Sequence, residues 1–224
     1  MAFKEPSVPG PPVPGTNTRF RGFMAEHALR ITLVGSRHFG VTTLDMLRQR
    51  GVDILRVVVA DADDRLAAAA RAAGIEVAVQ VNPKRVVASE VAPGTDLIVT
   101  AHSHARISKE ALATARLGGI GYHPSLLPRH RGIAAVEWTI REGDPIAGGS
   151  VYHLAERMDA GAIAAQEWVF VRKGETARQL WERALAPLGQ KLLGEVIDYA
   201  KTHKTLPAKP QDEEFATHAP ALSE

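Results

Sequence analysis

The sequence predicts an α/β protein with a doubly wound, mostly parallel sheet and antiparallel strands late in the chain. Three observations predict this class. Short apolar runs alternate with helical patterns over most of the chain, several of these patterns end at a glycine, and the last two strand-like runs follow each other closely. Alternating strands and helices favour a parallel sheet with helices on its faces, whereas adjacent strands favour an antiparallel pair.

The predicted strands are short, apolar and rich in β-branched residues, as strands buried on both faces usually are. The run over residues 31–34 ends at Gly35, and the next run has no interruption between Ile54 and Ala60. The later pair is expected to be antiparallel because few residues separate its members. The predicted strands cover residues 31–34, 54–60, 75–79, 97–100, 118–122, 148–155 and 163–171.

The predicted helices show apolar residues at helical spacing. Ser108 is expected to cap one of them, because a serine hydroxyl accepts a bond from the first free amides. The longest is expected to be kinked near Pro187. Trp138 and Trp181 are expected in the core. The predicted helices cover residues 41–50, 65–73, 108–115, 133–141 and 176–200.

Composition indicates one globular domain with two tails. The chain has 224 residues, of which 45% are hydrophobic, and its net charge of +2 does not point to nucleic acid or membrane. It has no cysteine, which excludes disulfides and thiol nucleophiles. Residues 1–28 form a proline-rich tail expected to be disordered, residues 29–200 the catalytic domain, and residues 201–224 a C-terminal tail. With no signal-peptide pattern, a cytoplasmic location is expected.

Histidines cluster where the fold class places its ligands. His102 and His104 follow one predicted strand, and His123 ends the next. In a doubly wound sheet, ligands bind at the carboxyl ends of the strands. Pro124 and Pro128 stiffen the loop after His123, so this imidazole is a candidate catalytic group. His130 and Arg131, further along, are assigned by default to a solvated loop.

Asp159 is the candidate partner of His123. It lies in a Met-Asp-Ala-Gly turn between the two late strands, and by itself this sequence is also typical of an ordinary turn. A carboxylate and an imidazole that converge at strand ends can share general acid–base work. The glycine-containing segment from Gly35 to Gly40 lacks dinucleotide-binding spacing and is a weak nucleotide signal.

These two segments carry a resemblance. His-Pro-Ser-Leu-Leu-Pro-x-x-Arg-Gly, starting at His123, followed by Met-Asp-x-Gly-x-Ile, resembles the formyltransferase family, over residues 30 to 200. The resemblance implies a Rossmann-like formyltransferase fold and 10-formyltetrahydrofolate as formyl donor. It assigns the family's catalytic histidine and aspartate to His123 and Asp159. The family's asparagine, two residues before the histidine, is replaced here by Gly121.

The resemblance also implies binding residues. His102, His104 and Arg106 lie where the family binds the pteridine, and Leu127 and Gly161 are assigned to the same donor site. His38 and Gly121 are assigned to the acceptor. Since glycine has no side-chain donor, a substitute is needed to stabilise the oxyanion, and we expect a histidine rather than Tyr122, whose side chain should point to the other side of its strand.

The expected activity is formyl transfer to an amine of a small molecule, without a membrane partner and with a homodimer left open. A tRNA acceptor is less expected, because the chain ends at Glu224 without the further domain of the tRNA enzyme. Two alternatives stay open. One is a metal-dependent hydrolase that uses His102, His104, His123 and Asp159, whose donor atoms suit zinc. The other is a folate-binding protein with weak activity because of Gly121.

Overall fold

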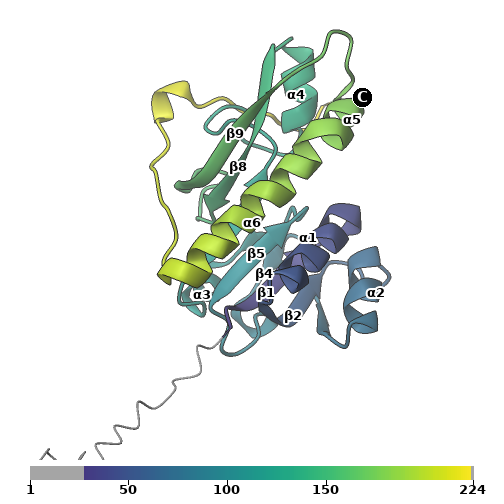
Figure 1. Ribbon diagram of the computed structural model, residues 1–224, viewed down its shortest axis with the longest axis vertical. Helices are drawn as coiled ribbons and strands as arrows, with labels where there is room; N and C mark the ends of the chain where they lie inside the picture. The colour runs from purple at the N-terminus through teal and green to yellow at the C-terminus, as the bar shows by residue number, and fades with distance from the viewer. Residues whose placement is uncertain (1–27, 223–224) are drawn as a thin grey trace, which may run out of the picture.

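A computed structural model describes residues 28–222, and it confirms the predicted fold class (Figure 1). Seven strands form one sheet in the order β3-β2-β1-β5-β7-β8-β9. The first five of these are parallel, β8 is antiparallel to β7, and β9 is antiparallel to β8. The N-terminal tail was expected to be disordered over residues 1–28. Of these, residues 1–27 lie outside the described range.

The strands are β1 (Arg30–Gly35), β2 (Asp53–Val59), β3 (Glu76–Val79), β4 (Arg85–Val86), β5 (Leu97–Ala101), β6 (Arg106–Ile107), β7 (Gly119–His123), β8 (Ile146–His153) and β9 (Ile163–Phe170). The helices are α1 (Arg37–Gln49), α2 (Arg65–Ala72), α3 (Lys109–Ala113), α4 (Ala135–Arg141), α5 (Ala177–Leu180) and α6 (Ala186–His203), with 3₁₀ turns η1 (Ala88–Glu90) and η3 (Glu213–Phe215) and a π-helical turn η2 (Trp181–Leu185). The two-stranded β4–β6 sheet was not predicted.

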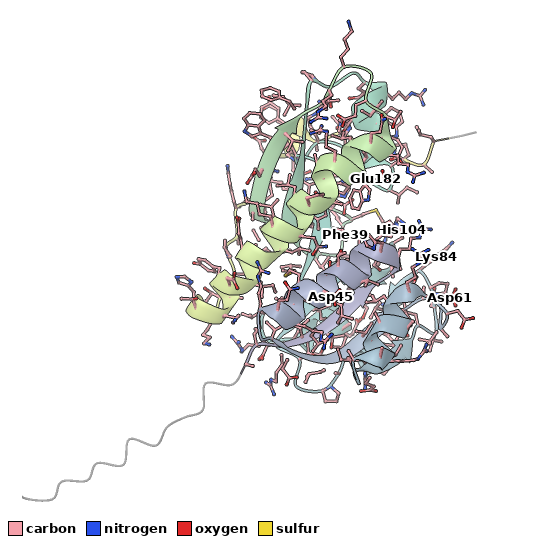
Figure 2. The ribbon with its side chains drawn as sticks, turned by 45° about the vertical axis from the view of Figure 1, so that its right-hand side comes forward. Phe39, Asp45, Asp61, Lys84, His104 and Glu182 are labelled. Atoms are coloured by element: carbon pink, nitrogen blue, oxygen red, sulfur yellow. The ribbon has the colours of Figure 1, made fainter. Side chains whose placement is uncertain are left out.

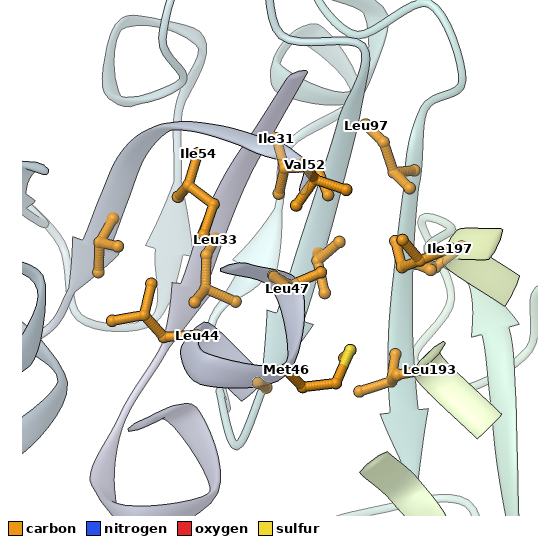
Figure 3. Packing of buried hydrophobic residues seen from close by; sticks show 14 of the residues in the cluster. Ile31, Leu33, Leu44, Met46, Leu47, Val52, Ile54, Leu97, Leu193 and Ile197 are labelled. Atoms are coloured by element: carbon orange, nitrogen blue, oxygen red, sulfur yellow. The ribbon is translucent and has the colours of Figure 1, made fainter. Parts of the chain in front are cut away.

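Both faces of the parallel sheet are buried, which explains its continuous apolar strands. In β1, Leu33 packs with α1 and α6, whereas its neighbour Val34 packs with α3 on the other face. Successive strand residues point to opposite faces, so β1, β2 and β5 contribute buried residues to both clusters. Figure 3 shows Leu44 and Leu47 of α1 against β1, with α6 residues beside them. Within residues 28–222, no helix combines the length and hydropathy needed to cross a membrane.

The strand order places the site. The chain winds outward from β1 to β3, then returns to β5 on the other side of β1, so the order reverses between β1 and β5. The loops after these two strands meet there, because the Ser36 hydroxyl donates to the backbone oxygen of His102 (2.7 Å). Such a switch point is where open α/β sheets bind ligands.

The predicted long helix changes its hydrogen-bond pattern before Pro187. Residues Trp181–Leu185 form the π-helical turn, and Pro187 lies in the first turn of α6. Proline has no backbone N–H, so it cannot bond to the carbonyl one turn earlier. In Figure 1, α6 runs diagonally across the molecule between the α1 side and the β8–β9 side.

Candidate active site

His123 is the last residue of β7 and is buried. Its Nε2 lies 2.7 Å from the backbone oxygen of His130, and because a carbonyl oxygen only accepts, this nitrogen carries a proton. Its Nδ1 faces Oδ2 of Asp159 at 3.7 Å, which is longer than a hydrogen bond. The Nδ1 edge is therefore the one available for a substrate.

Asp159 is held by donors other than His123. Its Oδ1 accepts a bond from the Tyr152 hydroxyl (2.7 Å), and its Oδ2 accepts one from the backbone N–H of Gly132 (2.8 Å). The Gln211 side chain donates to the Asp159 backbone oxygen (2.8 Å). These contacts come from three separate parts of the chain, and together they aim the carboxylate at the imidazole.

Gly121 has no room for a larger side chain. A Cβ at this position would overlap the hydroxyl oxygen of Thr100 and would lie 3.4 Å from the ring of Tyr152. The space that an asparagine would use is thus filled by neighbours. The side chain of Tyr122 points to the side of β7 opposite to Gly121, as predicted, and its hydroxyl donates to the backbone oxygen of Leu185 (2.6 Å).

A cavity of about 460 Å³, within the size range of small-molecule sites, is lined by His123 and Asp159. Of the predicted binding residues, His102, His104 and Arg106 line it. Phe39 and Trp181 also line it, with their rings 5.3 Å apart, and the partly buried Trp181 packs against the core as the sequence suggested. Figure 2 shows Phe39 and His104 near the middle of the molecule, below Glu182 of the π-helical turn.

The remaining predicted residues lie outside the cavity wall. Leu127 is buried; its backbone N–H donates to the Ser150 hydroxyl, and its backbone oxygen accepts from the Gln166 side chain. Gly161 is buried against the backbone oxygen of His153, where a Cβ would not fit. His38 is exposed on α1 and does not line the cavity, although both of its sequence neighbours do.

His102 carries an unusual combination of features. Its φ is 56°, in the left-handed region that non-glycine residues rarely adopt. Burial lowers the pKa of its imidazole, and the nearby positive charge of Arg37 lowers it further, so the ring is neutral. Its Nε2 is buried and has no hydrogen-bond partner within the described residues.

Left-handed residues concentrate at this site. Arg37, His102 and Asp159 have φ between 53° and 58° and all line the cavity, and His130, whose backbone oxygen holds His123, has φ 55°. Backbone conformations of this kind cost free energy and persist where the surroundings hold them, which is common at active sites. Their clustering marks this end of the sheet as a candidate site independently of the histidine motif.

His130 and Arg131 are buried, which contradicts their assignment to a solvated loop. The Arg131 guanidinium bonds Gln211 and Glu213 of the C-terminal segment, and the arginine lowers the pKa of Glu213 to about 2. The backbone of Arg131 pairs with this segment near His218. No local sequence pattern predicts these contacts, because they join residues about eighty positions apart.

The predicted metal ligands do not form a metal site. In the part of the chain that the structure describes, the single group with suitable spacing is His130, Glu142 and Asp144, which includes none of the four predicted ligands. Arg129 already contacts both carboxylates there, at 2.9 Å and 3.1 Å. A guanidinium occupies the position that a cation would take, so this cluster is an ion-pair network.

The family model for formyl transferases matches residues 29–197. The chain belongs to this family. Among curated relatives, it is 33% identical over 204 residues to mouse mitochondrial 10-formyltetrahydrofolate dehydrogenase, covering 86% of this chain and 22% of the relative. It is 31% identical over 217 residues to methionyl-tRNA formyltransferase of Rhodopirellula baltica, covering 88% and 64%. The chain therefore spans less than two thirds of either relative's length.

Solved structures confirm the fold. Glycinamide ribonucleotide transformylase 1 from Symbiobacterium toebii superimposes with a TM-score of 0.69 at 22% identity, covering 87% of this chain and 99% of that one. An N-formyltransferase from Helicobacter canadensis, in complex with folinic acid and dTDP-3-aminofucose, superimposes with a TM-score of 0.67 at 14% identity, covering 85% and 70%. At these identities the likeness concerns the sheet and its helices.

Proposed function

We propose that this formyl transferase moves a formyl group from 10-formyltetrahydrofolate to an amine of a small-molecule acceptor, with His123 and Asp159 as its catalytic pair. The observation that carries the proposal is the geometry of this pair. Nδ1 of His123 and Oδ2 of Asp159 face each other across 3.7 Å at the wall of the cavity, each held by other groups. The relatives with formyl-folate or formyltransferase in their names support the donor.

His123 serves as the proton donor. The amine nitrogen attacks the formyl carbon, a C–N bond forms, and the carbonyl oxygen becomes negative. As an imidazolium, His123 keeps its Nε2–H bonded to the backbone oxygen of His130 and presents its Nδ1–H to the negatively charged formyl oxygen. The same Nδ1–H then protonates the leaving folate nitrogen. Breaking of the old C–N bond restores the carbonyl, so the products are the formamide and tetrahydrofolate.

Asp159 serves as the proton acceptor. The attacking amine must lose one proton after the new bond forms, and the carboxylate accepts it directly or through water. The proton given up by His123 is thereby balanced by one taken up at Asp159. The hydrogen bonds from Tyr152 and Gly132 keep the carboxylate in position during this exchange.

The donor is assigned to the wall formed by His102, His104 and Arg106. The side chains of His102 and His104 line the cavity, and the Arg106 guanidinium beside them has no ion-pair partner within residues 28–222. A free guanidinium beside a cavity is suited to carboxylates. Leu127 and Gly161 support this site indirectly, because each packs behind the loops that carry the catalytic pair.

The acceptor is assigned to the α1 side of the cavity. The first backbone amide of α1, that of Arg37, already donates to the carboxylate of Asp64 (3.0 Å and 3.1 Å). A phosphate at this helix end would meet that negative charge, so an acceptor bound through phosphate here is disfavoured. Gly121 and His38 remain acceptor predictions, although Arg37 and Phe39 are closer to the cavity.

Turnover with a panel of amines tests the proposal. We expect tetrahydrofolate release that depends on an amine, with a formylated product identified by mass spectrometry. The His123→Ala variant should lose about 10²–10⁴-fold in kcat, the usual contribution of a positioned acid or base. His203→Ala, on the exposed end of α6, is the matched control. Formate release without an amine would indicate hydrolysis, and binding without turnover would indicate a folate-binding protein.

A further inference from the structure

Tyr152 lies on β8 directly opposite Gly121 of β7 in the sheet register. Its ring lines the cavity and meets the ring of His123 edge to face, with centroids 6.4 Å apart. Its hydroxyl donates to Asp159 over 2.7 Å. One side chain thus touches the glycine and both members of the catalytic pair.

The glycine and the tyrosine are sterically linked. The ring edge of Tyr152 lies in van der Waals contact with the position that a Cβ at residue 121 would take. A larger residue at 121 would press on this ring and on Thr100. The absence of a side chain at Gly121 therefore leaves room for the aromatic ring of Tyr152.

The hydroxyl has one proton, and it is already used. Burial raises the pKa of Tyr152 well above its usual value, and the negative charge of Asp159 raises it further, so the phenol keeps its proton. A phenol that donates its single proton to a carboxylate has none left for an oxyanion. Tyr152 therefore cannot replace an asparagine amide as oxyanion donor.

We propose that Tyr152 is the positioning residue of this active site, holding the Asp159 carboxylate toward Nδ1 of His123 from the space left by Gly121. This proposal rests on the proposed function. It explains how the site works with two catalytic side chains. The Asp159 carboxylate is fixed by the Tyr152 hydroxyl and the Gly132 backbone amide. In this arrangement the His123 imidazolium is the only hydrogen-bond donor that the oxyanion needs.

Tyr152→Phe removes the hydroxyl and keeps the ring. We expect kcat for formyl transfer to fall about ten- to hundredfold, the loss of one hydrogen bond to a charged group. KM for the donor and the dissociation constant of folinic acid should stay within about twofold, because the ring still fills its place beside Gly121. A merely structural role would weaken binding as well. Tyr199→Phe, whose hydroxyl lies on α6 away from the cavity, is the activity control.

A proton NMR measurement tests the contact without turnover. The Tyr152 hydroxyl proton should appear downfield, disappear in Tyr152→Phe, and lose its downfield shift in Asp159→Ala. In Tyr122→Phe it should persist, although that variant also loses a buried hydroxyl. A wild-type protein that neither binds folinic acid nor transfers formyl contradicts the proposed function itself. With an active wild type, a Tyr152→Phe variant of unchanged kcat overturns the Tyr152 proposal alone.

Discussion

The side-chain amide of Gln211 donates to the backbone oxygen of Asp159 (2.8 Å) and to that of Gly161 (2.7 Å), across about fifty residues of sequence. The Gln211 side-chain oxygen accepts in turn from Arg131 (2.7 Å). The segment after α6 therefore fastens the loop that carries Asp159. In Figure 1 this yellow segment runs along the side of β8 and β9.

Gln211→Ala should lower kcat by about tenfold while leaving the helices intact. The loop around Asp159 loses two hydrogen bonds, each worth about 0.5–1.5 kcal/mol, and the left-handed backbone at Asp159 loses support. Urea unfolding should show a decrease of about 1–2 kcal/mol in the free energy of unfolding. Glu214→Ala, at an exposed neighbouring position, is the control. Equal kcat in both variants would show that the segment does not support the loop.

Gly121→Asn should destabilise the protein rather than raise its activity. The new Cβ overlaps the Thr100 hydroxyl, and overpacking of this kind costs about 1–3 kcal/mol. Thr100→Ala removes the obstacle, so the double variant should recover part of the lost stability. Thermal unfolding of the four proteins in this cycle measures the coupling. Additive changes, or a gain in turnover from the single asparagine, would contradict the steric account.

Glu175→Gln should lower stability at neutral pH but not below about pH 2. The hydrogen bond from Arg183 is the main cause that lowers the pKa of Glu175 from 4.5 to about 2. A lowered folded-state pKa stabilises the protein above the unfolded value and loses its effect as pH falls toward the folded one. The difference between wild type and variant should thus shrink between pH 4.5 and about 2.

Glu182→Gln provides the comparison for that experiment. Its ion pair with Arg178 is exposed, and exposed pairs contribute about 0–1 kcal/mol. Chemical unfolding at several pH values would separate the two positions. A pH-independent effect of Glu175→Gln would show that its ionisation does not stabilise the fold.

Asp64→Ala should lower the free energy of unfolding by about 1–2 kcal/mol, because Asp64 caps α2 through the Leu66 amide (2.8 Å). It also binds the first amide of α1, so one carboxylate joins two helix ends. Asp63→Ala, whose side chain caps neither helix, is the control. Equal melting temperatures for the two variants would contradict this role.

Much of the fold was predictable because its signals are local. The apolar runs and the glycines after them correctly indicated the parallel strands, the late antiparallel pair and the long helix before His203. The β4–β6 sheet was missed because each strand has two residues, too few for any pattern. The kink expected near Pro187 stays a prediction, and the π-helical turn before this proline was not foreseen.

The sequence by itself determined where the seven strands of the main sheet lie, the candidate pair His123 and Asp159, and the family resemblance, because each depends on short local segments of the chain. Only the tertiary structure decided that Tyr152 faces Gly121, that Trp181 lines a cavity, and that Gln211 holds the Asp159 loop. These contacts depend on strand register and on the path of the final segment. Many side chains packing at once select that register and path, and no local pattern records the outcome.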